Sequence, residues 1–158
     1  MATPDFVLAL RDKIGTAPLW LSGVTAVVFR GEEVLLVKRA DTGSWTPVTG
    51  IVDPGEHPGT AAVRETWEEA AIVAVPERLV RVGVTGQVTY PNGDRSQYLD
   101  LVFRLRWESG TPFPADGENT EARWFASDHL PELSDDMRSR IQSAVDNHPE
   151  AHFEAPGH

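Results

Sequence analysis

The chain contains no cysteine among its 158 residues. Disulfides, thiolate catalysis and zinc sites with cysteine ligands are therefore excluded, and a cytoplasmic location is the default expectation. The chain also lacks an apolar run of the roughly 18 residues that a membrane-spanning helix needs, so no membrane partner is expected. Residues 1–11 mix charged and apolar side chains and do not follow the layout of a signal peptide.

Basic residues are scarce relative to acidic ones. Lysine and arginine number 14 against 24 aspartates and glutamates, which gives a formal net charge of −10. Such a surface repels a nucleic-acid backbone, so a nucleic-acid polymer is not an expected partner. A small phosphorylated substrate is compatible with this charge only if a metal ion or a few arginines provide a local positive charge.

The chain shows no internal repeat and no low-complexity segment. Its hydrophobic content of 41% suits one compact domain. We expect that domain over residues 1–148, with a core at about 20–130. Amphipathic patterns predict flanking helices at 5–14 and 134–147, and residues 149–158 are expected to form a mobile tail.

Two hairpins are predicted between these helices. The first joins Val24–Arg30 to Glu33–Arg39, and both strands have the apolar content of buried strands. The second joins Leu79–Tyr90 to Gln97–Trp107 through the turn sequence Asn92-Gly93-Asp94. Hairpins form antiparallel pairs, and helices must cover the faces of the sheet. The fold class is therefore α/β, with a mixed sheet sandwiched between helices.

A helix over residues 60–72 carries an acidic cluster. At 100° per residue, Glu65, Glu68 and Glu69 fall on one side. The side predicted to be buried lies opposite and contains Val63, Trp67 and Ala70. Three neighbouring carboxylates repel one another unless a hard divalent cation such as Mg²⁺ or Mn²⁺ binds between them. The alternative is an acidic helix face that is simply solvated.

The spacing around this cluster favours the cation. Gly50–Ile72 reads GIVDPGEHPGTAAVRETWEEAAI. This segment resembles the box of the Nudix hydrolase family, G-x5-E-x7-R-E-U-x-E-E-x-G-U. The matching positions are Gly50, Glu56, Arg64, Glu65, Glu68 and Glu69. Two positions depart from the family pattern: Thr66 replaces an aliphatic residue and Ala71 replaces the late glycine, which affects packing and the end of the helix.

The resemblance implies a Nudix-like fold and a Mg²⁺-dependent (or Mn²⁺-dependent) pyrophosphohydrolase. It implies a set of metal ligands made up of the Gly50 carbonyl, Glu65, Glu68 and Glu69. Arg64 and Glu56 correspond to the family's ion pair that orients the loop against the helix. The metal would offset substrate charge and activate a water for attack on phosphorus.

The general base that accepts the proton from this water has two candidates. One is Glu65 itself. The other is Glu118, in a loop six residues before Trp124, where the family often supplies an additional glutamate that can also bind metal. The alternative is that Glu118 is an ordinary acidic residue of a surface loop without a role in catalysis.

Three further residues are candidates for substrate binding, each with a structural alternative. Arg39 ends a strand and suits phosphate recognition, or is a surface charge. Trp45 can stack on a base or close the core. Tyr90 stands near the position of a tyrosine in dinucleoside-polyphosphate hydrolases, but an aromatic residue before a tight turn is also ordinary.

The predicted function is hydrolysis of a phosphoanhydride bond in a nucleoside diphosphate linked to another moiety. This class includes nucleotide sugars, nucleoside triphosphates and dinucleoside polyphosphates. The alternative is a domain of the same fold that senses a nucleotide without cutting it. The sequence leaves a homodimer open.

Overall fold

The computed structural model describes residues 3–157. Its elements follow in the order α1 (Asp5–Ile14), β1 (Leu19–Arg30), β2 (Glu33–Arg39), β3 (Trp45–Thr46), β4 (Val48–Ile51), α2 (Pro58–Ala70), β5 (Val73–Val84), β6 (Val88–Thr89), β7 (Arg95–Ser109), β8 (Asn119–Ala126) and α3 (Asp135–Asp146).

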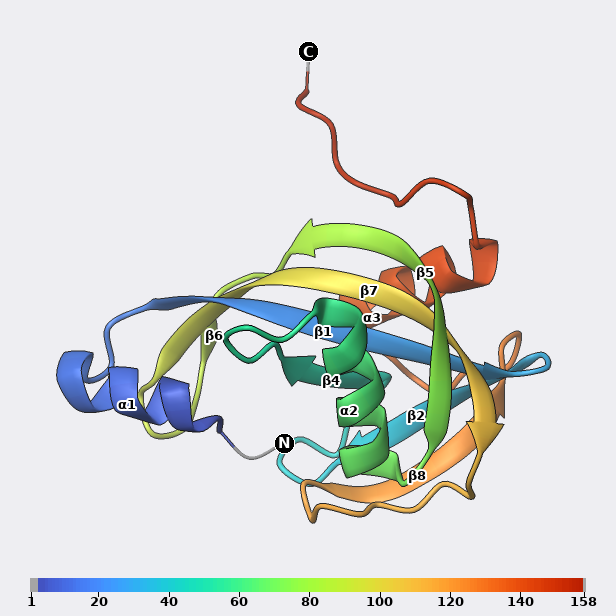
Figure 1. Ribbon diagram of the computed structural model, residues 1–158, viewed down its shortest axis with the longest axis horizontal. Helices are drawn as coiled ribbons and strands as arrows, with labels where there is room; N and C mark the ends of the chain where they lie inside the picture. The colour runs from blue at the N-terminus through green and yellow to red at the C-terminus, as the bar shows by residue number, and fades with distance from the viewer. Residues whose placement is uncertain (1–2, 158) are drawn as a thin grey trace.

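One mixed sheet of eight strands organises the chain (Figure 1). Its main path is β3-β2-β1-β7-β5, while β4 pairs with β1, β6 with β7 and β8 with β2. β1 and β7 run parallel over Leu19–Phe29 and Ser96–Arg106, and the other named strand pairs are antiparallel. The first predicted hairpin is confirmed by the register Phe29↔Val34 between β1 and β2.

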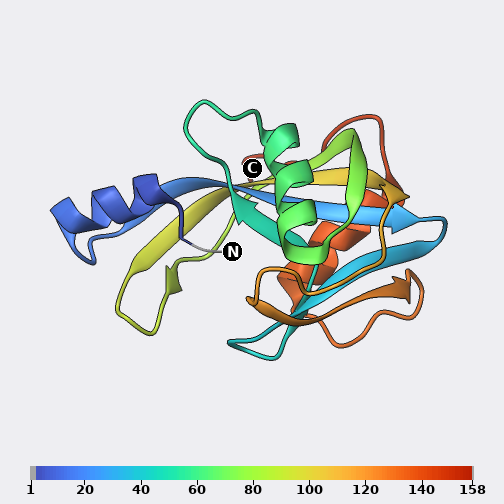
Figure 2. The same cartoon turned by 60° about the horizontal axis from the view of Figure 1, so that its bottom comes forward.

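Helices lie on both sides of this sheet. In Figure 1 α2 is in front of the strands and α3 is behind them, and Figure 2 shows the same layers after a turn. β2 shows why both faces are apolar: Leu35 and Val37 pack in the cluster that includes α2, whereas Val34 and Leu36 pack in the cluster that includes α3. This alternation, with its period of two residues, confirms the mixed sheet between helices.

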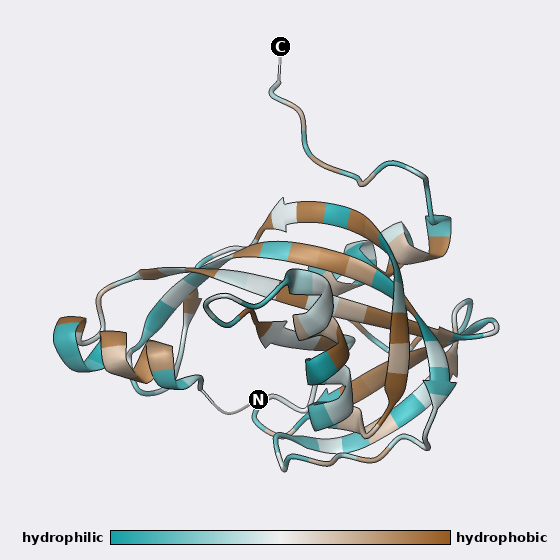
Figure 3. Cartoon of the chain, in the orientation of Figure 1, coloured by the Kyte–Doolittle hydropathy of each residue, from teal (hydrophilic) through white to brown (hydrophobic). Residues whose placement is uncertain are grey.

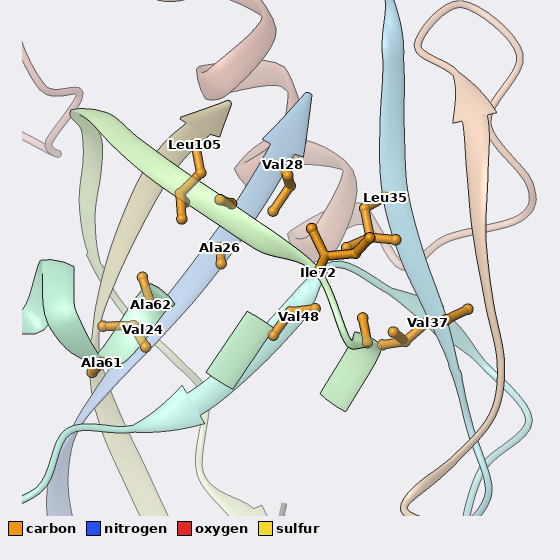
Figure 4. Close-up of a cluster of buried hydrophobic side chains, with 13 residues drawn as sticks. Val24, Ala26, Val28, Leu35, Val37, Val48, Ala61, Ala62, Ile72 and Leu105 are labelled. Carbon is orange, nitrogen blue, oxygen red and sulfur yellow. The ribbon is translucent and has the colours of Figure 1, made fainter. Parts of the chain in front are cut away.

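The larger apolar cluster fills the space between α2 and the sheet (Figure 4). The buried apolar side chains that the helix contributes to this cluster are the alanines Ala61, Ala62 and Ala70, while the strands contribute larger ones such as Leu35 and Leu105. Figure 3 shows the corresponding apolar colour on the strands that pass behind α2. The small residues allow the helix backbone to approach the sheet closely.

The second predicted hairpin forms in a modified way. Its first strand is interrupted, since β5 ends at Val84 and the short β6 follows. At the interruption, the Thr85 N–H donates to the Tyr98 carbonyl. The turn itself is closed by the Tyr90 N–H, which donates to the Asp94 carbonyl at 2.8 Å. The Asn-Gly-Asp turn is therefore confirmed.

Residues 3–22 and 84–98 form a projection that we call the wing, at the left of Figures 1 and 2. It combines α1, the start of β1 and the hairpin of β6 and β7. Arg11 fastens α1 to this hairpin: its Nη2 donates to the Arg95 carbonyl at 2.6 Å and to Ser96 Oγ at 3.2 Å. Val7, Leu21 and Ile51 form the small core beneath the helix.

α3 is positioned by a cap and by a buried polar network. Ser134 Oγ accepts from the Met137 N–H at 3.2 Å, as expected for an N-cap serine. Arg140 donates to Thr25 Oγ1 at 3.0 Å and lies 3.4 Å from Asp100 Oδ2. Burial raises the pKa of the Asp100 carboxyl, and the Arg140 charge opposes that rise. The network connects α3 with β1 and β7.

The segment expected to be a mobile tail starts along the sheet. The His152 N–H donates to the Val80 carbonyl at 2.8 Å, and the Val82 N–H donates to the His152 carbonyl at 2.9 Å. Beyond this bridge the chain leads away from the sheet (Figure 1). Among the helices of residues 3–157, none has the length and apolar content needed to cross a membrane.

Candidate active site

α2 begins and ends where its sequence allows. His57 is extended at the N-cap and Pro58 occupies the first turn, where its missing N–H costs no hydrogen bond. The helix ends at Ala70, and Ala71 adopts a left-handed conformation with φ 56° and ψ 32°. A residue other than glycine therefore takes the conformation that the family's glycine would favour.

Thr66 also has a clear local role. Its side chain is fully buried, and its Oγ1 donates to the Ala62 carbonyl one turn earlier at 2.7 Å. The hydroxyl is thus satisfied within the helix. A threonine can therefore stand at the family's aliphatic position without leaving a buried polar group unpaired.

The prediction of the buried face of α2 is confirmed for Ala70, which is fully buried, and for Val63, which packs against the apolar cluster, but it was wrong for Trp67 and for the two glutamates. Trp67 is 56% exposed, whereas Glu65 and Glu69 are only 1% and 3% exposed. The wheel assumed that the bulkiest apolar residues mark the buried side. In the structure the side against the sheet consists of small residues and two glutamates: Ala61, Ala62, Glu65, Thr66, Glu69 and Ala70.

Gly50 is required by the position of Glu65. A Cβ at Gly50 would collide with Cγ, Cδ and Oε1 of the Glu65 side chain. Gly50 lies in β4, where it pairs with Val24 of β1. The glycine of the box therefore gives the buried carboxylate its space beside the strand, and it brings the Gly50 backbone next to that carboxylate.

Arg64 forms ion pairs with Glu56, Glu65 and Glu68 of the box. Its Nε and Nη2 donate to the two Glu56 oxygens at 2.8 and 2.9 Å. Nη1 donates to Glu65 Oε1 at 2.9 Å and to Glu68 Oε2 at 3.2 Å, and Nη2 also reaches the Ile51 carbonyl. The hydrogen bonds from Arg64 lower the pKa of Glu56. The expected contact of Arg64 with Glu56 is present and ties the loop to the helix.

Glu65 and Glu69 are in a different electrostatic environment from Glu56, because burial is the largest influence on their pKa values. Burial raises the pKa of the Glu65 carboxyl to about 7, although the Arg64 charge opposes the rise. Burial likewise raises the pKa of Glu69 to about 7. Glu65 Oε2 is buried without a hydrogen-bond partner among the described residues. Both carboxylates are therefore costly to ionise in the protein alone.

A divalent cation fits these two carboxylates. A cation would stabilise the ionised form of both groups and provide a partner for the buried Glu65 oxygen. Glu68 also accepts from Arg64, as Glu65 does, but its side chain is 48% exposed and it is not part of the buried pair. Within residues 3–157 no three acidic or histidine side chains are already arranged as a metal cage. The residues that would hold the ion are Glu65 and Glu69, and the Gly50 backbone lies next to the Glu65 side chain.

Glu118 lies in the loop that leads to the site. Its carbonyl accepts from the Ala40 N–H at 2.9 Å, and its own N–H donates to Asp116 Oδ1 at 3.1 Å. The next residue, Asn119, is 6% exposed and its Nδ2 lies 3.5 Å from Glu69 Oε2. The loop is therefore next to the acidic helix. Asn119 was missed at the level of sequence, where a single asparagine at a strand start carries no distinctive signal.

Arg39 is on the same side of the sheet. Its Nε and Nη2 donate to Asp41 at 3.0 and 2.9 Å, which raises the pKa of the guanidinium. The charges of Glu69 and Tyr90 contribute in the same direction, so Arg39 is within electrostatic range of each of these two side chains. The Tyr90 hydroxyl is 2.6 Å from the Tyr98 hydroxyl, and burial raises its pKa.

Trp45 is not brought together with the box. It packs against Phe125 with ring centroids 4.9 Å apart, and it contacts the apolar cluster beside α3. Lys38, its partner across the β2–β3 ladder, lies 5.8 Å from its ring. This placement agrees with the core interpretation of Trp45.

An open cavity of about 420 Å³ lies against the box. Arg64, Glu65 and Glu68 of α2 line one side, and Asp53 and Pro54 of the preceding loop line another. The remaining wall belongs to the N-terminal segment and consists of Thr3, Pro4, Asp5 and Phe6. The cavity therefore joins the acidic helix to the wing.

Comparison with known proteins defines the class. The family model described as NUDIX domain matches residues 20–146, so the chain belongs to the Nudix hydrolase family. α1 lies outside this match. The chain is 31% identical to a MutT-like protein of Streptomyces ambofaciens, over 82% of this chain and 79% of that protein.

One further relative and one solved structure are also similar to this chain. The chain is 31% identical to the NAD-capped RNA hydrolase NudC of Pseudomonas syringae pv. syringae over 78% of its own length, but spans only 42% of that protein. The fold is similar to that of a NUDIX hydrolase from Nitrosomonas europaea, with a TM-score of 0.65 and 24% identity, covering 84% of this chain and 76% of the other. The family and the α/β fold expected from the box are thus confirmed.

Proposed function

We propose that the protein hydrolyses a phosphoanhydride bond in a nucleoside diphosphate linked to another moiety, with Mg²⁺ or Mn²⁺ as cofactor. The observation that carries this proposal is the buried pair Glu65 and Glu69 beside Gly50. Burial opposes their ionisation, and only a bound cation would make two such carboxylates favourable on the inner side of a helix.

The metal, when bound, would offset the charge of the diphosphate and lower the pKa of an attacking water. Glu65, Glu69 and the Gly50 carbonyl would hold it, and Glu68 would join them or hold a ligating water after leaving Arg64. Arg64 keeps the Glu56 loop against the helix and so fixes the site. Proton transfer from the water falls to Glu65 or to Glu118, the two candidates for the general base.

Arg39 supports binding of the diphosphate, because its planar guanidinium matches phosphate oxygens and it lies within range of Glu69. Tyr90 lies within range of Arg39 and would contact the nucleotide beside it. A role of Trp45 in stacking has the least support, given its contact with Phe125.

A small-molecule nucleotide is the proposed partner. The formal net charge of −10 disfavours a nucleic-acid polymer, and the similarity to the NAD-capped RNA hydrolase covers less than half of that protein. A cytoplasmic location is proposed from the absence of cysteine. Exposed apolar residues of the wing, such as Leu8 and Trp20, would support a homodimer.

The test is a screen with Mg²⁺ over nucleoside triphosphates, oxidised deoxynucleoside triphosphates, nucleotide sugars, ADP-ribose, CDP-alcohols and dinucleoside polyphosphates, in which chromatography separates each intact substrate from its two phosphorylated products. Glu69→Gln serves as the blank. Turnover that is lost in this variant supports the proposal. Nucleotides that raise the melting temperature yet stay intact with Mg²⁺ would instead support the alternative of a non-catalytic nucleotide sensor.

A further inference from the structure

The segment at 110–118, between β7 and β8, is bound to the end of α2 that carries Glu69 (Figures 1 and 2). The Phe113 N–H donates to the Ala70 carbonyl at 3.0 Å, and the Ala115 N–H donates to the Glu69 carbonyl at 3.2 Å. The last carbonyls of a helix have no partner within the helix, so these two bonds satisfy groups that would otherwise need water. The segment therefore fixes the Glu69 backbone relative to the start of β8.

The close approach of this segment depends on Gly110. Its φ is 101°, and a Cβ there would lie 2.6 Å from the carbonyl oxygen of Ala71. Ala71 is the left-handed residue at which α2 ends. The Gly110 carbonyl accepts from Trp107 Nε1 at 3.0 Å, which ties the start of the segment to β7. The segment is thus held against the helix end at its start as well as at its centre.

Side chains along β8 alternate between the two faces of the sheet. Ala122 packs in the apolar cluster that includes α2, whereas Phe125 packs in the cluster that includes α3. Counting back from Phe125 in steps of two places Asn119 on the face of α3, away from Glu69. The observed contact between Asn119 and Glu69 therefore requires a break in the alternation.

A β-bulge provides this break. In the ladder between β2 and β8 the register shifts after Lys38, so that Arg39 pairs with Asn119 and Thr120 is an extra residue on β8. A bulge bends the strand and redirects a side chain. Asn119 is thereby moved to the face of α2, where it is 6% exposed and its Nδ2 donates to Glu69 Oε2 at 3.5 Å.

The contact orients a buried carboxylate. Its distance is at the long end of the range for a hydrogen bond, but both side chains are almost fully buried, where such an interaction is stronger than in water. An amide N–H can only donate, so it favours the ionised form of Glu69, which is the form that binds a cation. Because Oε2 is held by the amide and the carboxylate is planar, the position of Oε1 is fixed as well.

We propose that Asn119 is a positioning residue, which holds the Glu69 carboxylate ionised and oriented for a divalent cation. This inference rests on the proposed function, because it concerns the cation that the hydrolysis would use. Asn119 acts through Glu69 and does not itself contact the cation. The bulge at Thr120 and the segment at 110–118 keep the two side chains in register.

The experiment measures cation binding, which needs no substrate. Mg²⁺ and Mn²⁺ are titrated by calorimetry into the chelator-treated unmodified protein, Asn119→Ala, Asn119→Leu and Thr120→Ala, and a melting curve of each metal-free protein establishes that it is folded. The leucine variant keeps the branched shape of asparagine without its donor, whereas the alanine variant loses both. Thr120→Ala is the matched control, because Thr120 is an exposed neighbour in the same bulge.

Both Asn119 variants are expected to bind each cation more weakly by about tenfold or more, and to the same extent, because both lack the donor. Thr120→Ala should bind as tightly as the unmodified protein. Weaker binding in one of the two Asn119 variants alone would show that volume matters rather than the donor, and would overturn the proposal. Equal weakening in Thr120→Ala would overturn it too, because the cause would then be a general change in the bulge.

The same titration separates this inference from the function on which it rests. Saturable binding to the unmodified protein, with undiminished binding to both Asn119 variants, would overturn the positioning role and leave the cation site in place. No binding to the unmodified protein would overturn the cation site and this inference with it.

Discussion

The acidic side of α2 and the wing place their residues in opposite ways. On α2, two carboxylates are buried, Glu65 at 1% and Glu69 at 3% exposure. On the wing, apolar side chains such as Leu8 and Trp20 are more than half exposed. α2 gives up stability to hold charge at the site, whereas the wing depends on Arg11 and a small core to stay attached. The proposed site therefore lies where the metal-free protein buries carboxylates at a cost in folding free energy.

The largest expected effect comes from Glu69→Gln. Removing a group that binds or orients the metal should lower kcat by roughly 10²–10³-fold. The same change removes a buried carboxyl that is costly to ionise, so the metal-free protein should melt at a higher temperature than the unmodified one near neutral pH. Steady-state kinetics and calorimetric melting in a chelator measure both.

The matched control on the wing is Asp12→Asn, a change of the same charge at an exposed position. It should alter neither kcat nor the melting temperature beyond small surface effects. If Glu69→Gln lowered the metal-free melting temperature instead, the burial cost assigned to Glu69 would be wrong.

The pH dependence of stability should also distinguish the two regions. Because the pKa of Glu65 and of Glu69 is raised to about 7 in the folded protein, the folded state binds protons that the unfolded state has released. The contribution of these two carboxyl groups to the free energy of unfolding is fully present at low pH, and it is lost as the pH rises from about 4.5 through 7. The size is on the order of a few kcal/mol, and bound Mg²⁺ should abolish it.

This contribution is isolated by comparing melting curves of the unmodified protein and of Glu65→Gln plus Glu69→Gln, each in a chelator. Shifts of groups that both proteins share, such as Glu56 and Asp100, cancel in the difference. A difference that stays constant over this pH range would contradict the raised pKa values.

On the wing, the corresponding change is Arg11→Ala. It removes the hydrogen bonds to Arg95 and Ser96 and should lower the stability of the wing by about 1–3 kcal/mol. Hydrogen exchange should show faster exchange in α1 and the β6–β7 hairpin while α2 keeps its protection. Equal loss of protection in α2 would show that the wing and the box are one cooperative unit.

The smallest expected effect is at the end of α2. Ala71 has a left-handed conformation that glycine adopts without steric cost, so Ala71→Gly should stabilise the protein by about 0.5–1 kcal/mol. Ala70→Gly, one residue earlier inside the helix, should destabilise it instead. Chemical denaturation of both variants measures the difference, and equal effects of the two would contradict the αL assignment.

The sequence predicted the layers and the box because both depend on local patterns. The β1–β2 hairpin followed from its apolar strands, and Gly50 with its glutamates followed from spacing. The orientation of α2 could not be predicted in this way. Size and polarity favour burying Trp67, but the close contact of α2 with the sheet and the need to hold Glu65 inside reverse that preference.

Contacts that depend on tertiary structure were also beyond prediction. Asn119 meets Glu69 across 50 residues, and no periodicity signals such a contact. The cavity wall made by Asp5 and Phe6 depends on how the wing folds back on the box. Trp45 could stack or fill the core, and only its contact with Phe125 in the assembled sheet favours the core.

The central claim is that the buried pair Glu65 and Glu69 forms a cation site. The most direct test is calorimetric titration of Mg²⁺ into the chelator-treated protein and into Glu65→Gln, Glu69→Gln and Asp12→Asn. We predict saturable binding to the unmodified protein and to Asp12→Asn, and binding weakened by about tenfold or more in each glutamine variant. Binding of equal strength in all four proteins, or no binding to the unmodified one, would contradict the account.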